Sequence, residues 1–389
     1  MFEFKEETPH SLTIQSLELR SFRNYETLQL NNIGNTSVFV GENAVGKTSI
    51  VEAIQLLTDM KSFRSTHASE LVSWNSDHAQ VKAVFTDGQR VLEEVLDIKD
   101  GKRRYSLNGK PKSVQTLKGL LPAVIFTPDD LNLVKGPHSK RRESIDNLGM
   151  QLSKNFHAVR NDYQKLLKQK NQALKDGLSR AVVESINEVL AKVGAQYLSH
   201  RLILLDTFTP LFSHAYKTIT SGNEQATIRY RFLWGDECGV EEFIDQSPKE
   251  LLQKHLVTAL SGAIDEEYAR KKSVVGPHAD HITYVLAKAG DNQGFRNASQ
   301  YASQGQQRSI TLASKMAELR TIQTIVHQQP VLLLDDVMSE LDETRRTMFM
   351  QLVEDGIQTF ITTTNLSYFN DDLISNAHIY HLPFKEPIA

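Results

Sequence analysis

The sequence predicts an α/β fold that combines a mixed core, an antiparallel β meander and an inserted helical region. Apolar residues alternate over 12–30 and form a continuous run over 37–40, and a helical apolar pattern follows over 50–57. Short β-rich stretches between 81 and 109 are separated by Asp-Gly and Asn-Gly pairs, which favour tight hairpin turns. From about 139 to 220 the apolar spacing becomes helical.

The helical insertion divides the chain into three segments. We expect residues 1–134 to form the N-terminal part of a head, 135–265 a helical lobe, and 266–389 the C-terminal part of the head. The apolar seam of the helical lobe lasts only two to three heptads, which favours packed helices over an extended coiled-coil arm. The last segment should contain a turn with a strand, then a helix, then two strands, over 273–286, 302–320, 330–336 and 358–364.

Composition places the chain among ordinary globular proteins. Its 389 residues exceed a typical single domain, and 40% of them are hydrophobic and 23% charged. No stretch approaches the length of a transmembrane helix and the acidic start does not resemble a secretory signal, so we expect a cytoplasmic protein. We interpret the single cysteine, Cys238, as a core or surface residue because it has no paired ligand.

The net charge of −3 does not indicate a nucleic-acid binder, so any such binding must be local. The best candidate is residues 135–170, where nine cations face three acids and leave an excess of +6. The cations are Lys135, Lys140, Arg141, Arg142, Lys154, Arg160, Lys165, Lys168 and Lys170. A run of this kind can also be only the solvated face of a helix.

A glycine-rich segment lies between the strand expected at 37–40 and the helix expected at 50–57. It matches the pattern G-x-x-x-x-G-K-[ST], in which backbone N–H groups surround phosphates, the lysine neutralises charge and the hydroxyl binds Mg²⁺. Its residues are Gly41, Glu42, Asn43, Ala44, Val45, Gly46, Lys47 and Thr48, followed by Ser49. The N-terminus of the next helix adds a positive dipole. We therefore expect this segment to bind a nucleotide.

Two carboxylates end the apolar strand VLLLDD. Asp335 and Asp336 follow four apolar residues, and packing alone does not require two acids at that point. Phosphoryl transfer depends mainly on positioning and charge neutralisation. We expect Asp335 to hold Mg²⁺, together with Thr48, and Asp336 to orient or deprotonate the attacking water.

Further segments carry a family resemblance. FRNY at 22–25, SQGQ at 303–306 and SELD at 339–342, together with the two motifs above, resemble the ABC-type ATPases of DNA repair, the group that contains the SMC proteins. Supporting segments at 126–146 and 274–281 extend the likeness over nearly the whole chain. The resemblance implies an ABC-type P-loop ATPase head with ATP and Mg²⁺ as ligands.

The resemblance also implies that the nucleotide site is shared between two chains. In such ATPases two chains pair head to tail, and each nucleotide lies between the P-loop of one chain and the signature motif of the other. Ser303 and Gly305 would then contact the γ-phosphate held by the partner chain, and Gln306 of the same segment would belong to the nucleotide-binding residues. The alternative for Ser303 is an ordinary N-cap of the helix expected at 302–320.

Other roles follow from the resemblance alone. Asp342 resembles the aspartate that connects the two sites of the dimer, and Arg23 and Asn24 resemble residues near the adenine and phosphates. Lys47, Asp336 and Ser303 would be the catalytic residues. The implied function is an ATP-controlled clamp on DNA, single-stranded, double-stranded or at gapped junctions, that dimerises on ATP, hydrolyses it slowly and has no membrane partner.

The chain departs from the general ABC pattern in four places. Gln304 replaces the first of two adjacent glycines in the signature, and Asp336 stands where a glutamate is usual. Thr363 or Thr364 stands near the usual position of a histidine that senses the γ-phosphate. No clear glutamine loop is present, and we expect residues 126–131 to be its counterpart by position.

Three alternatives remain open at this point. One is a related ATPase that works with a nuclease, although the sequence shows neither a long coiled coil nor a fused nuclease-like acidic cluster. Another is the ATPase subunit of a transporter, against which the altered signature and the meander count. The third is a P-loop kinase, which would need neither SQGQ nor SELD.

Overall fold

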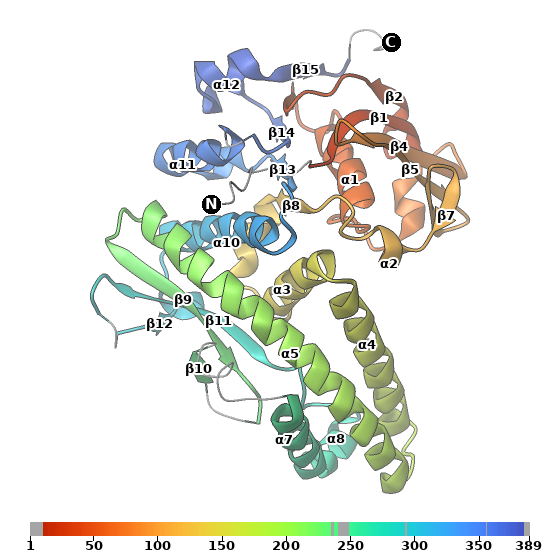
Figure 1. Ribbon diagram of the computed structural model, residues 1–389, viewed down its shortest axis with the longest axis vertical. Helices are drawn as coiled ribbons and strands as arrows, with labels where there is room; N and C mark the ends of the chain where they lie inside the picture. Colours follow the sequence, from red (N-terminus) through yellow and green to blue (C-terminus); the bar gives the residue numbers. More distant parts are fainter. Residues whose placement is uncertain (1–10, 235–236, 240–248, 292–293, 355, 385–389) are drawn as a thin grey trace, which may run out of the picture. The chain divides into compact units, whose positions relative to one another are not determined.

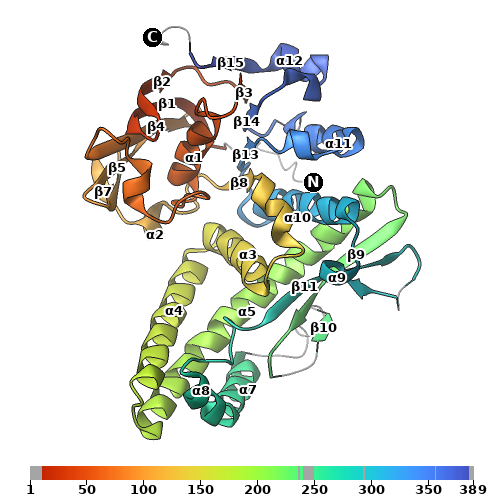
Figure 2. The same ribbon diagram turned by 180° about the vertical axis from the view of Figure 1, so that it is seen from behind.

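The computed structural model describes residues 11–234, 237–239, 249–291, 294–354 and 356–384, and it contains two compact units (Figures 1 and 2). Unit 1 comprises Met1–Asp130 and Ile322–Ala389, and unit 2 comprises Leu131–Thr321. Both ends of the chain therefore build unit 1. No helix within the described ranges is long and apolar enough to cross a membrane.

The second boundary differs from the expected one at residue 265. Strand β11 (His281–Lys288) pairs along its whole length with β9 (Glu224–Arg231), from His281 opposite Arg231 to Lys288 opposite Glu224. This pairing holds residues 281–288 in the sheet of unit 2. Unit 2 extends to Thr321 and so also contains the segment with SQGQ. The sequence pattern gave no sign of this, because strand partners far apart in the chain leave no local signal.

An antiparallel sheet in unit 1 contains the expected meander. Its strand order is β2-β1-β4-β5-β6-β7, with bounds Thr13–Phe22 for β1, Tyr25–Leu30 for β2, His78–Thr86 for β4, Val91–Lys99 for β5, Lys102–Leu107 for β6 and Lys110–Lys112 for β7. Asp100 and Gly101, and likewise Asn108 and Gly109, have positive φ. Two consecutive residues of this conformation form the tight hairpin turn that suits the twist of neighbouring strands.

A parallel sheet of unit 1 joins strands from both ends of the chain. Its order is β15-β3-β14-β13-β8, with bounds Thr36–Gly41 for β3, Ala123–Phe126 for β8, Val331–Asp335 for β13, Thr359–Thr363 for β14 and His378–Leu382 for β15. Helix α1 (Lys47–Thr58) packs on strands of both sheets (Figure 1). Apolar residues of α1 and of the inner faces of the two sheets form one core.

Short helical segments complete unit 1. They are η1 (Ala68–Leu71), α2 (Val114–Leu117), η2 (Pro128–Leu133, which crosses into unit 2), η3 (Met338–Glu340), α11 (Glu343–Glu354), η4 (Leu366–Tyr368) and α12 (Asp371–Asn376). The expected strands at 330–336 and 358–364 correspond to β13 and β14.

Unit 2 combines helices with a small sheet of order β10-β9-β11-β12. The remaining strands and the helices are β10 (Glu237–Gly239), β12 (Arg296–Asn297), α3 (His138–Leu152), α4 (Lys154–Lys175), α5 (Arg180–Ile219), α7 (Lys249–Gly262), α8 (Ile264–Arg270), α9 (Ala298–Tyr301) and α10 (Gln304–Val326, which runs on into unit 1). Cys238 lies in β10 opposite Tyr230.

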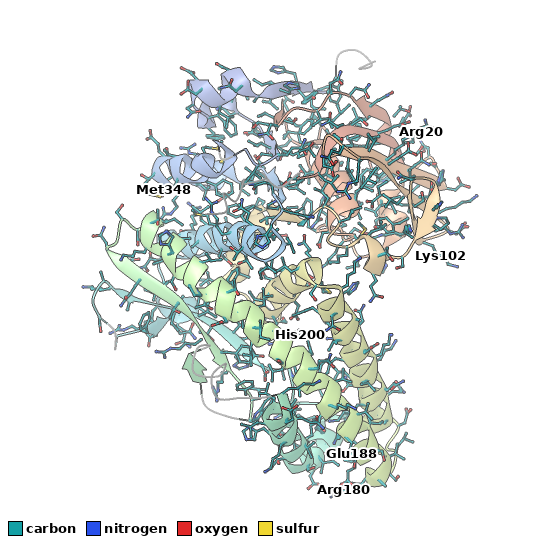
Figure 3. The ribbon with its side chains drawn as sticks, in the orientation of Figure 1. Arg20, Lys102, Arg180, Glu188, His200 and Met348 are labelled. Atoms are coloured by element: carbon teal, nitrogen blue, oxygen red, sulfur yellow. The ribbon has the colours of Figure 1, made fainter. Side chains whose placement is uncertain are left out.

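The expected helical run breaks at Ser153. The Oγ of Ser153 accepts a hydrogen bond of 3.2 Å from the backbone N–H of Phe156, so Ser153 caps α4. Helix α5 turns back along α4, and Figure 3 shows Arg180 at the tip of this helix pair and His200 midway along α5. The two helices pack on each other within unit 2.

Candidate nucleotide-binding site

The glycine-rich loop lies where β3 ends and α1 begins, as the motif requires. Gly46 immediately precedes α1 with φ of 107°. A Cβ atom at this position would come within 2.5 Å of Asn24 Nδ2 and 2.7 Å of Tyr25 Oη. Only glycine fits both the conformation and the space. The loop thus ends at the N-terminus of α1, where free backbone N–H groups and the helix dipole favour an anion.

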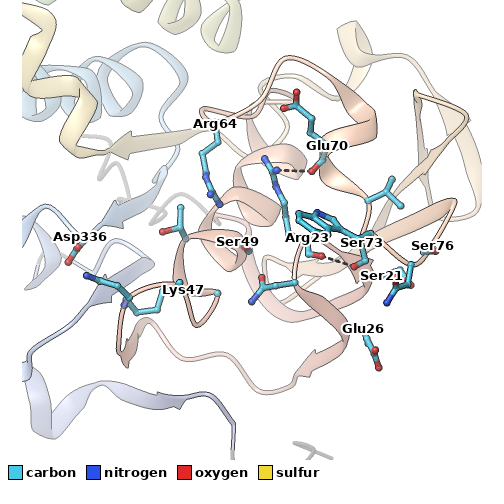
Figure 4. A pocket seen from close by; sticks show the side chains of 18 residues that line it. Ser21, Arg23, Glu26, Lys47, Ser49, Arg64, Glu70, Ser73, Ser76 and Asp336 are labelled. Carbon is cyan, nitrogen blue, oxygen red and sulfur yellow. Dashed lines mark hydrogen bonds between the residues drawn. The ribbon is translucent and has the colours of Figure 1, made fainter.

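The ammonium group of Lys47 is hydrogen-bonded to the backbone of its own loop. Lys47 is buried, and its Nζ donates hydrogen bonds to the carbonyl oxygens of Gly41 at 2.8 Å and Glu42 at 2.7 Å. Burial lowers the pKa of Lys47, and the negative charges of Asp336 and Asp335 oppose that shift. Figure 4 shows Lys47 and Asp336 facing each other. Phosphate oxygens could replace the two carbonyls as acceptors.

The two carboxylates reach the loop because β3, β14 and β13 are adjacent parallel strands whose carboxyl ends meet at one edge. Asp335 is buried, and its Oδ1 accepts a hydrogen bond of 2.8 Å from Thr362 Oγ1. A hydrogen bond from Thr48 also reaches this carboxylate. Burial raises the pKa of Asp335, and the two hydrogen bonds oppose the shift.

Asp336 occupies a strained position directly after β13. Its φ is 52°, and its N–H donates to Thr362 Oγ1 at 3.0 Å, so the threonine hydroxyl fixes both neighbouring acids. Burial raises the pKa of Asp336, and the charge of Lys47 opposes this. The sequence did not single out Thr362; it pointed instead to Thr363 or Thr364 as the residue near the γ-phosphate. Thr363 is buried and donates to Asn365 O, whereas Thr364 is exposed.

The donor set suits Mg²⁺. The Thr48 hydroxyl and the Asp335 carboxylate are hydrogen-bonded neighbours, and both offer hard oxygen atoms. Mg²⁺ in phosphoryl-transfer sites commonly takes one or two protein ligands and completes its shell with phosphates and water. These two residues therefore fit the ion.

Arg23 lines the cavity, but its guanidinium forms a bidentate ion pair with a buried acid. Its Nε and Nη2 donate to the two carboxylate oxygens of Glu52 at 2.8 and 2.7 Å, and Nη1 donates to Glu70 O at 2.7 Å. Glu52, on α1, has no exposed surface. Sequence reasoning placed Arg23 beside the nucleotide and did not find Glu52. Nothing in the local pattern links residues 29 positions apart.

Arg64 is a further cation at the cavity that sequence reasoning missed. It lies in the segment KSFR after α1, is partly exposed and lines the cavity. Its Nη1 is 3.7 Å from Glu52 Oε2, and its charge also acts on Asp335. Arg64 can therefore offer positive charge to a phosphate.

The cavity has a volume of about 910 Å³, within the range of small-molecule sites. Figure 4 shows Lys47 and Asp336 on one side and Ser21, Ser73 and Ser76 on the other. Predicted residues that line it are Arg23, Asn24, Asn43, Ala44, Gly46, Lys47, Thr48, Ser49 and Asp336. Gly41, Glu42 and Val45 belong to the loop but do not line the cavity, and neither does Asp335, which is hydrogen-bonded to the lining residue Thr48.

The signature segment lies in unit 2 and forms a reciprocal cap. The N–H of Gln306 donates to Ser303 Oγ at 3.2 Å, and the N–H of Ser303 donates to Gln306 Oε1 at 2.8 Å. This is a capping box at the start of α10, so the N-cap interpretation of Ser303 is confirmed for the single chain. Ser303 is nevertheless exposed, as is Gln304, and Gly305 is partly exposed. The Gln306 amide also donates to Glu224 Oε1 at 2.7 Å.

Asp342 lies in unit 1 at the start of α11. Its Oδ1 accepts the N–H of Arg345 at 3.0 Å, and its other oxygen pairs with the Arg345 guanidinium. The side chain is exposed. In the single chain Asp342 therefore caps α11.

Several cations of the basic stretch form hydrogen bonds or ion pairs with other residues of unit 2. Arg141 is buried, and its guanidinium donates to the carbonyl oxygens of Ile282, Leu133, Val134 and Gly136. Arg142 donates to Asp280 O, and Lys170 forms a fully buried ion pair with Glu267. The exposed cations that remain are Lys135, Lys140, Lys154, Lys165 and Lys168. The local excess of charge is therefore smaller at the surface than in the sequence.

The parallel sheet, the P-loop before α1, the two acids at the carboxyl end of β13 and the antiparallel sheet define the head of an ABC-type P-loop ATPase. Residues 13–381 match the family model described as RecF/RecN/SMC N terminal domain, and the chain belongs to this family. Within it, the chain groups with RecF proteins.

Relatives of similar length support that placement. The DNA replication and repair protein RecF of Heliobacterium modesticaldum is 34% identical over 381 residues, which cover 95% of this chain and 97% of the relative. RecF of Geobacillus thermodenitrificans is also 34% identical, over 383 residues and with the same coverage. These matches do not favour the transporter, kinase or nuclease-partner alternatives.

Solved structures agree in fold. A structure of the recombination mediator protein RecF with ATP in the RecFOR pathway is similar with a TM-score of 0.83 and 28% identity, covering 94% of this chain and 96% of that one. The SMC head domain from Pyrococcus furiosus is similar with a TM-score of 0.53 and 16% identity, covering 97% and 95%. The second likeness concerns the fold alone.

Proposed function

We propose that the chain is an ATP-controlled DNA-binding protein of recombinational repair and replication-fork maintenance. One observation carries the proposal: Lys47, Thr48, Asp335 and Asp336 converge at one edge of the parallel sheet beside a cavity large enough for a nucleotide. The RecF relatives supply the biological context, because their names describe DNA replication and repair.

The chain's own residues divide the work of hydrolysis. Lys47 exchanges the carbonyls of Gly41 and Glu42 for phosphate oxygens, and Thr48 with Asp335 would hold Mg²⁺, which supplies charge neutralisation at the phosphates. Asp336 orients the attacking water. Because burial raises its pKa, Asp336 is a better proton acceptor than an exposed aspartate. Its side chain is shorter than the usual glutamate, and we expect slow, DNA-stimulated hydrolysis.

The signature helix supports a site shared by two copies of the chain. Ser303 is exposed at the N-terminus of a long helix, where backbone N–H groups and the helix dipole favour an anion. We propose that Ser303, Gly305 and Gln306 of one copy contact the γ-phosphate held by the P-loop of another. ATP would then link the two copies, and hydrolysis would release them, which makes the ATPase a timer.

DNA and the mediators are the proposed partners. The similar solved structure is described as part of the RecFOR pathway, and we propose RecO and RecR as partners of this chain at gapped junctions. Exposed lysines of α4, Lys154, Lys165 and Lys168, are available for phosphate contact. Location in the cytoplasm stays a prediction.

Sedimentation without nucleotide, with ADP and with ATP, each with and without gapped DNA, tests the proposal. We expect a dimer only with ATP and tighter DNA binding by the dimer. A protein that stays monomeric with ATP and ignores DNA would contradict the proposal.

A charge-matched pair of variants sharpens that test. Ser303→Arg should keep ATP binding, because the P-loop of the same chain is intact, but should lose dimerisation and hydrolysis. Ser185→Arg places the same charge at another exposed serine of unit 2, on α5, and should behave like the wild type. Loss of ATP binding by the Ser303→Arg monomer would show that the proposed geometry is wrong.

A further inference from the structure

Trp74 is a fully exposed indole at the edge of the nucleotide cavity. It belongs to the segment SWNS, lines the cavity and is one of two tryptophans in the chain. The other large apolar side chains of unit 1 that line this cavity or surround the P-loop are buried or partly buried. A tryptophan left wholly in water has the largest apolar surface of any side chain to offer to a ligand.

The backbone around Trp74 is held in place. The N–H of Ser76 donates to Ser73 O at 3.0 Å, which closes a turn with Trp74 and Asn75 at its centre. The N–H of Ser73 donates to Ser21 O at 2.9 Å, and Ser73 Oγ donates to the carbonyl of Arg23 at 2.7 Å. The turn is therefore tied to the hairpin of β1 and β2 that also borders the cavity.

This support has a physical consequence for binding. A side chain presented on a fixed backbone loses little conformational freedom when a ligand covers it, so more of the contact energy appears as affinity. The indole has only two rotatable bonds, which reduces that loss further. Trp74 is thus prepared to contact a flat ligand.

The two ends of the cavity differ in chemistry. Lys47 and Asp336 lie at one side with the P-loop, and Ser73 and Ser76, which flank Trp74 in the turn, lie at the other (Figure 4). A ligand that spans the cavity would have anionic groups at the first end and an aromatic ring at the second. A nucleoside triphosphate has this arrangement.

We propose that Trp74 stacks on the purine ring of the bound nucleotide and supplies much of the affinity for the base. The inference rests on the proposed ATP function and adds the residue that holds the base. Stacking depends on the face of the ring rather than on its hydrogen-bonding edge, so GTP should gain from Trp74 as ATP does. The phosphates are held independently by the P-loop.

Intrinsic fluorescence gives a direct readout. In a Trp234→Phe background, Trp74 is the single tryptophan. ATP should change its emission, whereas inorganic tripolyphosphate, which has the phosphates and no base, should bind without that change. Emission that responds equally to both probes would overturn the stacking proposal.

Affinity measurements separate the base from the phosphates. Trp74→Ala should raise the Kd for ATP about tenfold, in line with the usual cost of losing one base stack, and should leave the Kd for tripolyphosphate unchanged. Trp74→Phe should recover most of the affinity for ATP. Because Trp74 is fully exposed, neither variant should change the thermal stability.

The outcomes distinguish this inference from the function on which it rests. If the wild type binds neither ATP nor tripolyphosphate, the proposed function fails. If the wild type binds ATP and Trp74→Ala binds it equally well, the stacking role fails and the ATP function stands. A Trp74→Ala variant that weakens both probes alike would show that the turn supports the phosphates instead, which also contradicts the proposal.

Discussion

Replacing Arg23 by methionine should destabilise unit 1 more than it weakens nucleotide contact. The substitution leaves Glu52 fully buried without its bidentate partner. Breaking one side of a buried ion pair typically costs about 3–5 kcal/mol. We expect about 3 kcal/mol, at the low end, because Arg64 lies 3.7 Å from the same carboxylate and Ser62 also donates to it. For a unit of about 200 residues this corresponds to a fall in Tm of roughly 6–12 °C, measurable by calorimetry.

A double variant provides the control. Arg23→Met with Glu52→Leu removes both charges and should recover much of the lost Tm, because a buried pair replaced by apolar groups is often neutral. The double variant should bind ATP about as well as the wild type. A single variant that melts like the wild type would refute the reasoning about the buried pair. A stable double variant that still fails to bind ATP would show that Arg23 contacts the nucleotide directly.

Three further outcomes follow from the structure. Gly46→Ala should weaken ATP binding about tenfold or more, because Gly46 has a positive φ and an added Cβ would come within 2.5 Å of Asn24 Nδ2. Gly88→Ala is the control, because Gly88 also has a positive φ but lies in open space, and its ATP affinity should be unchanged. Equal ATP-binding curves for the two variants would contradict this expectation. Glu94 is buried without a hydrogen-bond partner and its pKa is raised to about 8, so its contribution to stability is full below about pH 4.5 and is lost as the pH rises to about 8. Glu94→Leu should therefore raise the free energy of unfolding at pH 8.5 by up to about 5 kcal/mol, seen as a higher Tm, and should not raise it at pH 4.5. A stability difference between variant and wild type that is the same at both pH values would contradict the role of the Glu94 charge. Lys165→Gln with Lys168→Gln should make the slope of log K for DNA against log salt shallower by up to about 2 units, and an unchanged slope would remove α4 from the DNA surface.

Local patterns predicted the parts of the site that depend on neighbouring residues. The P-loop needs a strand, a glycine turn and a helix in sequence, and the structure has them in that order at Gly41–Lys47. The two acids at the end of β13 were equally visible because they directly follow four apolar residues. Their approach to the P-loop was expected from the motif pair, and the order of the parallel strands explains it.

Features that depend on distant pairing escaped the sequence. The pairing of Arg23 with Glu52 joins the turn between β1 and β2 to α1, and no local pattern indicates it. Thr362 does not stand out because its neighbours are equally polar threonines. Arg141 and Lys170 were included in the basic stretch, but both are buried, and a run of cations in the sequence does not show which of them are buried. A sequence shows how much charge a segment carries, but the fold decides how much of it reaches the surface.

Mixing two inactive variants tests the shared site most directly. Lys47→Met removes the phosphate-binding ammonium and Ser303→Arg blocks the signature, so each variant alone should hydrolyse no ATP. In a mixed pair, the P-loop of the Ser303→Arg chain can meet the intact signature of the Lys47→Met chain and form one complete site. We predict that ATP hydrolysis reappears on mixing and rises with the fraction of mixed dimer. A mixture no more active than the two variants measured apart would contradict the shared site.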